Sequence, residues 1–149
     1  MKISIEEKDI SEISLIKPLW EGLRNYHNSL PNGTVSNKQF EERVGQLEEK
    51  AKNGKIQILI AVDDQSGTYI GYSISTISKE NEGELDSLFL LEQYRSQGIG
   101  DMLMNKSMGW FDENGVNNIR ILVSYLNGDA VKFYKKFKFE PISLILKRQ

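Results

Sequence analysis

Cysteine is absent from this 149-residue sequence, and histidine occurs once, at His27. Without cysteine there is no disulfide, no thiolate metal ligand and no cysteine nucleophile. A metal site or a Ser-His-Asp triad would have to be built around His27, and no motif surrounds that residue. We therefore expect a protein without a metal site.

Long apolar runs and an excess of positive charge are absent as well. No segment approaches the roughly 18 apolar residues of a membrane-spanning helix, and the charged residues 1–8 lack the apolar stretch of a secretory signal. The formal net charge of -2 provides no overall basic field for nucleic acid. One local lysine cluster is expected to be a solvated helix face, and it consists of Lys132, Lys135, Lys136 and Lys138. These absences predict a cytoplasmic protein that contacts neither a membrane nor nucleic acid.

Length and composition fit one domain. Hydrophobic residues make up 39% of the chain and charged residues 27%, which is enough to bury a core and remain in solution. No internal repeat, low-complexity tract or linker interrupts the chain, so we predict a single domain over residues 1–149.

Hydrophobic periodicity gives the expected order of elements. Alternating or short continuous apolar segments predict strands over residues 2–6, 56–62, 69–77, 84–91, 119–123 and 141–146. Apolar residues at helical spacing predict helices over residues 13–27, 40–51, 98–113 and 130–137. Ser36, with Gln39 three residues later, is a capping-box signature before the second helix.

The connections predict how the strands pair. The strands between residues 56 and 91 are joined by short turns and should be antiparallel. The crossover from Leu91 to Ile119 passes through a helix and is long enough to make its flanking strands parallel. The expected fold is therefore α/β (α+β) with a mixed, mostly antiparallel sheet.

The segment Leu88–Gly100 carries the most informative pattern, because an apolar strand leads into a polar loop and glycines open a helix. The first N–H groups of a helix have no internal partners, and the helix start carries about half a positive charge. Gly98 and Gly100 lack side chains that would block the approach of an anion to the backbone, and Arg95 adds a full positive charge. A pyrophosphate would fit there.

Two other phosphate-binding loops do not match. A P-loop ends in Gly-Lys-Ser/Thr, whereas Gly100 is followed by Asp101 and Met102. The dinucleotide fingerprint has a third glycine three residues after the second, where this sequence has Leu103. These differences disfavour a nucleotide-binding domain of another kind, while a glycine pair that binds no ligand stays open as the simpler interpretation.

The segment Arg95–Gly100, Arg-Ser-Gln-Gly-Ile-Gly, resembles the Gln/Arg-x-x-Gly-x-Gly/Ala signature of the GNAT superfamily of N-acetyltransferases. Glu84–Leu90 resembles the fourth strand of that family, and Asn127–Tyr134 resembles its Asn-x-x-Ala-x-x-x-Tyr motif. All three segments fall within Glu84–Phe139, over a third of the chain.

Three positions depart from the family pattern. Glu92 stands where proline is frequent, Ser96 replaces a frequent glycine or arginine, and Lys138 replaces a glycine that often precedes the phenylalanine after the last helix. None of them removes a proposed catalytic group, but Lys138 calls the geometry of the helix exit into question.

The resemblance implies a sheet of six to seven strands flanked by about four helices, in which the central parallel strands splay apart and coenzyme A lies in the gap. Acetyl-CoA is the implied co-substrate. The β-strand backbone would pair with its pantetheine amides, and the loop backbone would hold its pyrophosphate. The implied cofactor-binding residues are Leu88, Phe89, Leu90, Arg95, Ser96, Gln97, Gly98, Ile99, Gly100, Asp101, Asn127 and Tyr134.

The resemblance also implies the catalytic groups of a direct transfer in a ternary complex. Glu84 resembles the carboxylate that serves as general base in several family members, and Asp86 is a second candidate on the same strand face. Both could instead be solvent-facing strand carboxylates. Tyr134 resembles the general acid that protonates the leaving thiolate, with a core aromatic as the alternative.

The acceptor is constrained only as an amine, on a small molecule or on a protein. Four side chains are candidates for lining its site, with packing as the alternative for each: Trp20, Tyr26, His27 and Tyr72. The alternative function is a non-catalytic acyl-CoA-binding module, against which Glu84 and Tyr134 argue, since a pure binder needs neither base nor acid. The sequence leaves the oligomeric state open, a homodimer included.

Overall fold

The computed structural model describes residues 2–30 and 38–148. Within these residues, one mixed sheet has the strand order β1-β2-β3-β4-β5. The strands are β1 (Ile3–Lys8), β2 (Lys55–Asp63), β3 (Thr68–Ile77), β4 (Gly83–Leu90) and β5 (Ile119–Ile121). The first four pair antiparallel with their neighbours, and β4 pairs with β5 in parallel. The predicted α+β fold with a mixed, mostly antiparallel sheet is confirmed.

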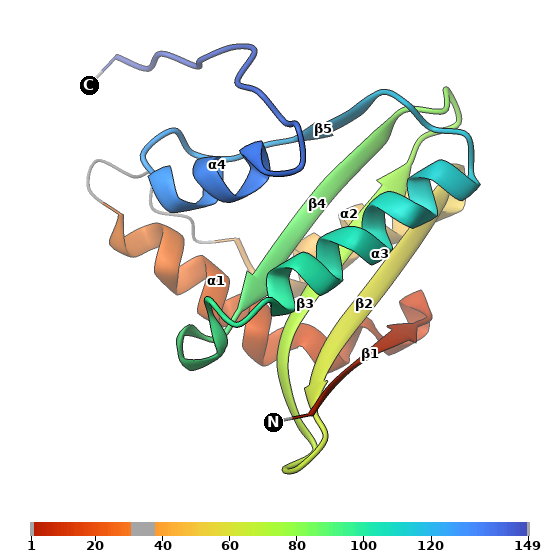
Figure 1. The fold of residues 1–149 in the computed structure, drawn as a ribbon. Helices are drawn as coiled ribbons and strands as arrows, with labels where there is room; N and C mark the ends of the chain where they lie inside the picture. Colours follow the sequence, from red (N-terminus) through yellow and green to blue (C-terminus); the bar gives the residue numbers. More distant parts are fainter. Residues whose placement is uncertain (1, 31–37, 149) are drawn as a thin grey trace.

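Helices cover both faces of this sheet (Figure 1). The α-helices are α1 (Lys17–Ser29), α2 (Phe40–Asn53), α3 (Ile99–Glu113) and α4 (Gly128–Lys135), and the 3-10 helices are η1 (Ile10–Ile16) and η2 (Glu92–Tyr94). In Figure 1, α3 crosses the front of the sheet while α1 and α2 lie behind it. Among the described residues, no helix has the length and apolar character that a membrane span requires.

Local signals explain where the helices begin. The helix predicted over residues 13–27 is divided into η1 and α1, because α1 starts at Lys17 with Pro18 in its first turn, where no N–H partner is needed. α2 begins at Phe40 with a capping box between Gln39 and Glu42. Gln39 thus takes the N-cap position, and the predicted capping residue Ser36 lies outside the described residues.

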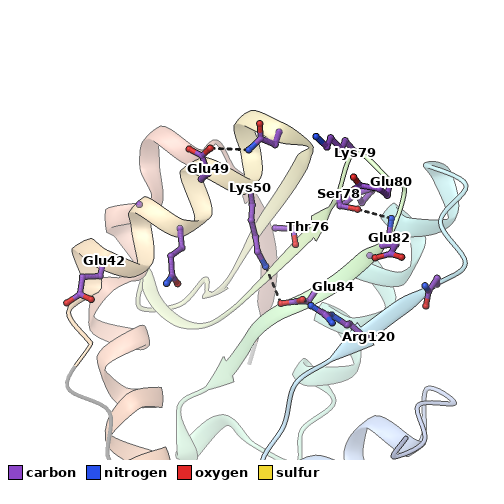
Figure 2. A pocket seen from close by; sticks show the side chains of 16 residues that line it. Glu42, Glu49, Lys50, Thr76, Ser78, Lys79, Glu80, Glu82, Glu84 and Arg120 are labelled. Carbon is purple, nitrogen blue, oxygen red and sulfur yellow. Dashed lines mark hydrogen bonds and ion pairs between the residues drawn. The ribbon is translucent and has the colours of Figure 1, made fainter. Parts of the chain in front are cut away.

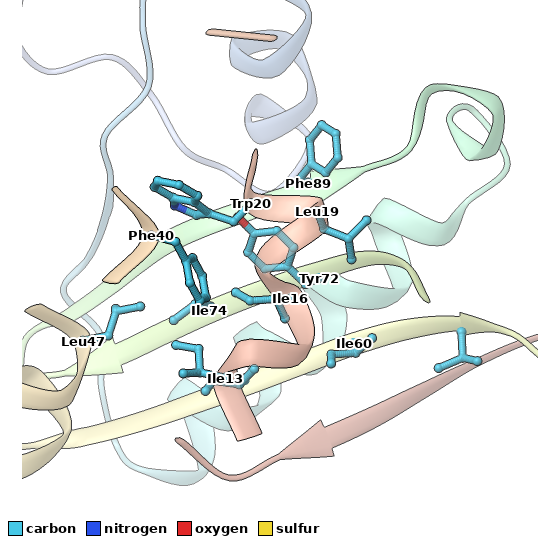
Figure 3. Packing of buried hydrophobic residues seen from close by; sticks show 12 residues of the cluster. Ile13, Ile16, Leu19, Trp20, Phe40, Leu47, Ile60, Tyr72, Ile74 and Phe89 are labelled. Carbon is cyan, nitrogen blue, oxygen red and sulfur yellow. The ribbon is translucent and has the colours of Figure 1, made fainter. Parts of the chain in front are cut away.

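The sheet has a hydrophobic core on each face. On one face, Ile60 and Tyr72 pack with Leu47 and other side chains of η1, α1 and α2 (Figure 3). On the other face, Leu59 packs with Leu103 of α3. Because side chains alternate along a strand, β2 and β3 are buried on both faces, which explains their almost continuous apolar sequence.

β4 contains a bulge at Asp86. This residue lies between the pairs Ile74↔Ser87 and Ser75↔Leu85 and has no partner in β3. The bulge turns the side chains of Asp86 and Ser87 to the same face of the sheet, where each forms a hydrogen bond with a β3 side chain. It therefore places a carboxylate and a hydroxyl next to each other on the α1–α2 side.

The strand predicted over residues 141–146 is not formed, so the described part of the sheet has five strands and not six or seven. Ile142 and Leu146 are 92% and 90% exposed. Pro141 has no N–H to donate to a ladder, and the edge strand β5 is short, ending at Ile121. The alternating pattern identified residues that suit a strand, but it carries no information about whether a partner edge is available.

Gly71 of β3 occupies a point where the sheet has no room for a side chain. A Cβ atom there would lie 2.6 Å from Leu90 Cδ2 and 2.8 Å from the Phe89 carbonyl oxygen. We expect Gly71→Ala to lower the free energy of unfolding by about 1–3 kcal/mol, because the backbone contact cannot be relieved by a rotamer change.

The matched control is Gly45→Ala in α2, where a Cβ would meet no atom within 4 Å. Alanine should be neutral there or stabilise the protein by up to about 1 kcal/mol, since it is the better helix former. Urea unfolding of both variants measures the difference, and equal stabilities would contradict this packing.

Candidate functional site

A cleft opens where β4 and β5 part. Their pairing runs from Gly83↔Ile119 to Leu85↔Ile121, after which β4 continues to Leu90 paired with β3 but not with β5. The strand predicted over residues 119–123 is therefore short, and the splayed parallel strands are confirmed. The cleft has a volume of about 1030 Å³ and is lined by α1, β4, the loop before α3, the chain after β5 and α4.

The free edge of β4 presents backbone groups to this cleft. Leu91 N donates to Ile70 O, so Leu90 belongs to a non-hydrogen-bonded pair of the β3–β4 ladder. Because such pairs alternate with hydrogen-bonded ones, the N–H and C=O of Phe89 point to β3. Those of Leu88 and Leu90 point to the edge that β5 has left. This edge can therefore pair with an extended ligand through two residues rather than the three that the resemblance implied.

The start of α3 also borders the cleft. Gly98 is its N-cap and has a φ of 82°, in the left-handed region that glycine adopts without strain. No side chain caps the helix, and Met102 N makes its bond to Gly98 O. The N–H groups of residues 99–101 thus have no partner inside the helix and form its positive end, so an anion such as a diphosphate fits there.

Gly100 has a structural role beside the expected one. A Cβ at this position would lie 3.1 Å from Cζ of Phe133 on α4. The missing side chain therefore lets α4 approach the start of α3, in addition to leaving the backbone accessible.

The Arg95 side chain is held at the end of β4. Its Nε donates to Leu90 O at 3.0 Å, and its guanidinium carbon lies 5.3 Å from the Tyr26 ring centroid and 5.5 Å from that of Phe89. These contacts direct the predicted positive charge toward α1. The charge lines the cleft, but part of its hydrogen-bonding capacity is already used.

Asn127 connects α4 to α1. Its Oδ1 accepts a hydrogen bond from Ala130 N at 3.2 Å, which caps α4, and another from the Tyr26 hydroxyl at 3.4 Å. Asn127 is buried, and it lines the cleft. Since its oxygen has two donors, its side-chain amide N–H groups are the part suited to a ligand.

Tyr134 lines the same cleft from α4. Its ring centroid lies 5.4 Å from that of Phe133 and 6.4 Å from that of Phe139. Burial raises the pKa of the Tyr134 phenol to about 12, so the group keeps its proton at neutral pH. Among the described residues the hydroxyl has no hydrogen-bond partner, which leaves its proton available to a ligand.

Glu84 lies in a second cleft of about 900 Å³ on the α2 side of the sheet (Figure 2). Its carboxylate is 3.2 Å from Lys50 Nζ and 3.0 Å from Arg120 Nε. Burial by itself would raise the pKa of Glu84, but the two cations outweigh it and lower the pKa. Glu84 is therefore an ionised carboxylate with two partners, outside the cleft that holds Tyr134.

Asp86 lies between the two clefts. It lines the first, and its carboxylate bonds to Lys50 of the second and to Thr76 Oγ1 at 2.5 Å. The Asp86 side chain is fully buried, which raises its pKa, although the bonds from Lys50 and Thr76 oppose this shift. Lys50 therefore joins both predicted carboxylates, and no sequence signal pointed to it.

Most of the predicted cofactor residues meet in the first cleft. Those that line it are Leu88, Phe89, Leu90, Arg95, Ser96, Gly98, Gly100, Asp101, Asn127 and Tyr134. Two do not: Gln97 is exposed and donates to Gln93 O, and Ile99 is buried in the core.

The predicted acceptor wall is only partly formed by the expected residues. Tyr26 and His27 line the first cleft, whereas Trp20 and Tyr72 are buried in the core. Lys136 also lines the cleft, although its lysine cluster was expected to be merely solvated. Spacing alone did not distinguish Lys136 from its neighbours. Among the described residues, no group of acidic, histidine or cysteine side chains is arranged to hold a metal ion.

Comparison with known proteins agrees with this site. Residues 20–139 match the model of the Acetyltransferase (GNAT) family. The uncharacterized N-acetyltransferase YuaI of Bacillus subtilis is 25% identical over 140 residues, covering 91% of this chain and 76% of that protein. The uncharacterized N-acetyltransferase MJ1207 of Methanocaldococcus jannaschii is 33% identical over 72 residues, 48% of this chain, and the match spans only 32% of that protein.

Solved structures share the fold. An acetyltransferase of the GNAT family from Staphylococcus aureus Mu50 matches with a TM-score of 0.78 at 19% identity, over 95% of this chain and 87% of that one. The aminoglycoside N-acetyltransferase AAC(6')-Iy in complex with CoA matches with a TM-score of 0.72 at 17% identity, over 99% and 94% of the two chains. With the family model covering most of the sequence and the fold in agreement, the chain belongs to the acetyltransferase (GNAT) family.

Proposed function

We propose that this chain is an N-acetyltransferase that moves the acetyl group of acetyl-CoA directly onto a primary amine in a ternary complex. Its family makes it an acetyl-transferring enzyme with acetyl-CoA as co-substrate. The observation that carries the proposal is one cleft that joins the open edge of β4, the uncapped start of α3 and the Tyr134 hydroxyl. These features suit the amides, the diphosphate and the thioester of acetyl-CoA, respectively.

Backbone groups would make most of the contacts to the co-substrate. Leu88 offers its N–H and C=O groups and Leu90 its N–H group to an extended pantetheine arm, while Leu90 O already accepts a hydrogen bond from Arg95 Nε. The free N–H groups of residues 99–101 suit the diphosphate, and the amide N–H groups of Asn127 suit the pantetheine arm.

Tyr134 is the proposed general acid. When the amine nitrogen attacks the thioester carbon, the C–N bond forms, the C–S bond breaks, and the sulfur leaves as a thiolate. A phenol with a pKa raised to about 12 is still protonated at neutral pH and can donate to that thiolate.

Glu84 is the proposed general base, with Asp86 as the alternative. An alkylammonium with a pKa of about 10.4 must lose a proton before it attacks, which costs on the order of 4–5 kcal/mol at pH 7. The Glu84 side chain is 23% exposed, whereas that of Asp86 is fully covered by its partners. Glu84 is therefore more open to an amine or a relaying water that enters through the second cleft once Lys50 moves aside, whereas Asp86 lines the first cleft with Tyr134.

For the acceptor we propose a small molecule with several amino groups. Acidic side chains outnumber basic ones around the second cleft, which is lined by Glu42, Glu49, Glu80, Glu82 and Glu84 and by Lys50, Lys79 and Arg120 (Figure 2). The excess of acidic side chains would attract a polycation. Proteins named aminoglycoside acetyltransferases also occur among the structures of the same fold.

An acceptor screen tests this function. The enzyme is mixed with acetyl-CoA and, separately, with polyamines, aminoglycosides, and peptides with a free N-terminus or lysine, and release of free thiol is followed. We expect thiol release in proportion to acetylated amine for a small polyamine-like acceptor. Release of thiol only with peptides would show that the acceptor is a protein amino group and not a small molecule. Tight CoA binding without release for any amine would leave a non-catalytic acyl-CoA-binding module.

Replacing Tyr134 with Phe removes one oxygen and keeps the ring in place. If the phenol protonates the thiolate, kcat should fall by about 10–10³-fold while the affinity for CoA and the melting temperature hold. Steady-state kinetics and calorimetry measure the three quantities. Tyr125→Phe is the control, because Tyr125 is 69% exposed and is absent from the cleft lining. A Tyr134→Phe enzyme as fast as the parent, when chemistry limits the rate, would exclude the acid role.

Glu84→Gln removes the proposed base. Turnover should fall more at neutral pH than near pH 10, because free amine is abundant at high pH and needs no base. A pH–rate profile measures this, with Asp86→Asn as the parallel variant and Glu48→Gln as a control, because Glu48 is exposed on α2 and lines neither cleft. A uniform loss across pH would mean that Glu84 positions the acceptor or supports β4 through Lys50 and Arg120.

A further inference from the structure

The start of α3 carries a carboxylate where an anion is expected to bind. Asp101 lies in the first turn of α3 and lines the first cleft. A carboxylate in this position stabilises a helix start, because it faces the positive end of the helix dipole. The same charge would repel a diphosphate bound to the N–H groups of residues 99–101. Asp129 of α4 adds a second carboxylate to the cleft lining.

Lys136, the C-cap of α4, offsets the Asp101 charge. Its Nζ lies 3.0 Å from Asp101 Oδ1. The Lys136 ammonium also lies 4.9 Å from the Phe133 ring centroid, and Phe133 in turn packs against Gly100. Aromatic contact and ion pair together hold this ammonium over the start of α3.

Within the described part of the chain, Lys136 is the one lysine or arginine of the cleft lining that contacts Asp101. Arg95, the other cation that lines it, is tied to Leu90 O and to the Tyr26 and Phe89 rings. The Lys136 and Asp101 side chains are 56% and 45% exposed, so their ion pair adds little to folding stability. A structural role therefore does not account for the pair.

We propose that Lys136 is a positioning residue for acetyl-CoA, which neutralises Asp101 and thereby makes the start of α3 able to accept the diphosphate. The inference rests on the proposed function, which puts the diphosphate at this helix start. Without Lys136, the Asp101 carboxylate would face the phosphates unopposed. If both the Lys136 and the Asp101 charges are removed, only the N–H groups of residues 99–101 act on the phosphates, and binding is restored.

A double-mutant cycle tests this role. Calorimetry with CoA is carried out on the parent, Lys136→Met, Asp101→Asn and the double variant; methionine keeps the apolar stem of the lysine. We expect Lys136→Met to weaken CoA binding by about 5- to 30-fold, Asp101→Asn to bind at least as tightly as the parent, and the double variant to return to within about 3-fold of the parent. Lys132→Met, one turn earlier in α4 and outside the cleft lining, should stay within about 2-fold.

A second substrate distinguishes an effect of Lys136 on the diphosphate from a general effect on the enzyme. The kcat/KM with S-acetylpantetheine, which lacks the diphosphate, should be the same in the parent and in Lys136→Met. A double variant as weak as Lys136→Met would overturn the proposal, because Lys136 would then contact the phosphates itself. Unchanged CoA affinity in Lys136→Met would overturn it too. A parent that fails to bind CoA would remove the proposed function together with this inference.

Discussion

The loss of pairing between β4 and β5 is the constraint on which the rest of the site depends. The two strands share only three residue pairs before β4 continues to Leu90 without its parallel neighbour. A strand edge with free N–H and C=O groups is a template for another extended chain. In this protein that edge is enclosed by α1, α4 and the start of α3, so it can accept an elongated ligand while being shielded from another protein's strand.

Charge is arranged differently in the two clefts. On the α2 side, Lys50 joins the carboxylates of Glu84 and the buried Asp86. Arg43 Nη2, at 3.7 Å, and the Thr76 hydroxyl also contact the Asp86 carboxylate, so Lys50 shares the stabilisation of β4 with them while it also lowers the pKa of the proposed base Glu84. The first cleft presents backbone dipoles, and of its charged side chains Lys136 pairs with Asp101, while Arg95 bonds to the carbonyl oxygen of Leu90.

Much of the fold could be predicted because it depends on local patterns. The period of the apolar residues identified β1 to β4 and the four helices, and the turn lengths predicted which strands are antiparallel. Gly98 and Gly100 identified the helix start in the cleft. Two departures from the family pattern also proved informative: Ser96 and Lys138, where the family often has glycine, adopt φ values of 62° and 70°. Such left-handed conformations are strained for residues with a Cβ atom.

What could not be predicted depends on contacts between distant residues. The partnership of Lys50 with two β4 carboxylates joins positions 34 and 36 residues apart, and that of Lys136 with Asp101 joins positions 35 apart. Nothing in the spacing of charges along the chain indicates such pairs. The same limit applies to the predicted strand over residues 141–146, since an alternating pattern does not determine whether a segment pairs with a sheet edge.

Amide hydrogen exchange followed by NMR, with and without saturating CoA, tests the central claim most directly. If the opened edge of β4 and the start of α3 hold the co-substrate, CoA should slow exchange at Leu88, at Leu90 and at residues 99–101, and leave the amides of α2 beside Lys50 unchanged. Slowed exchange in α2 with none at these β4 and α3 amides, while CoA is demonstrably bound, would contradict the account.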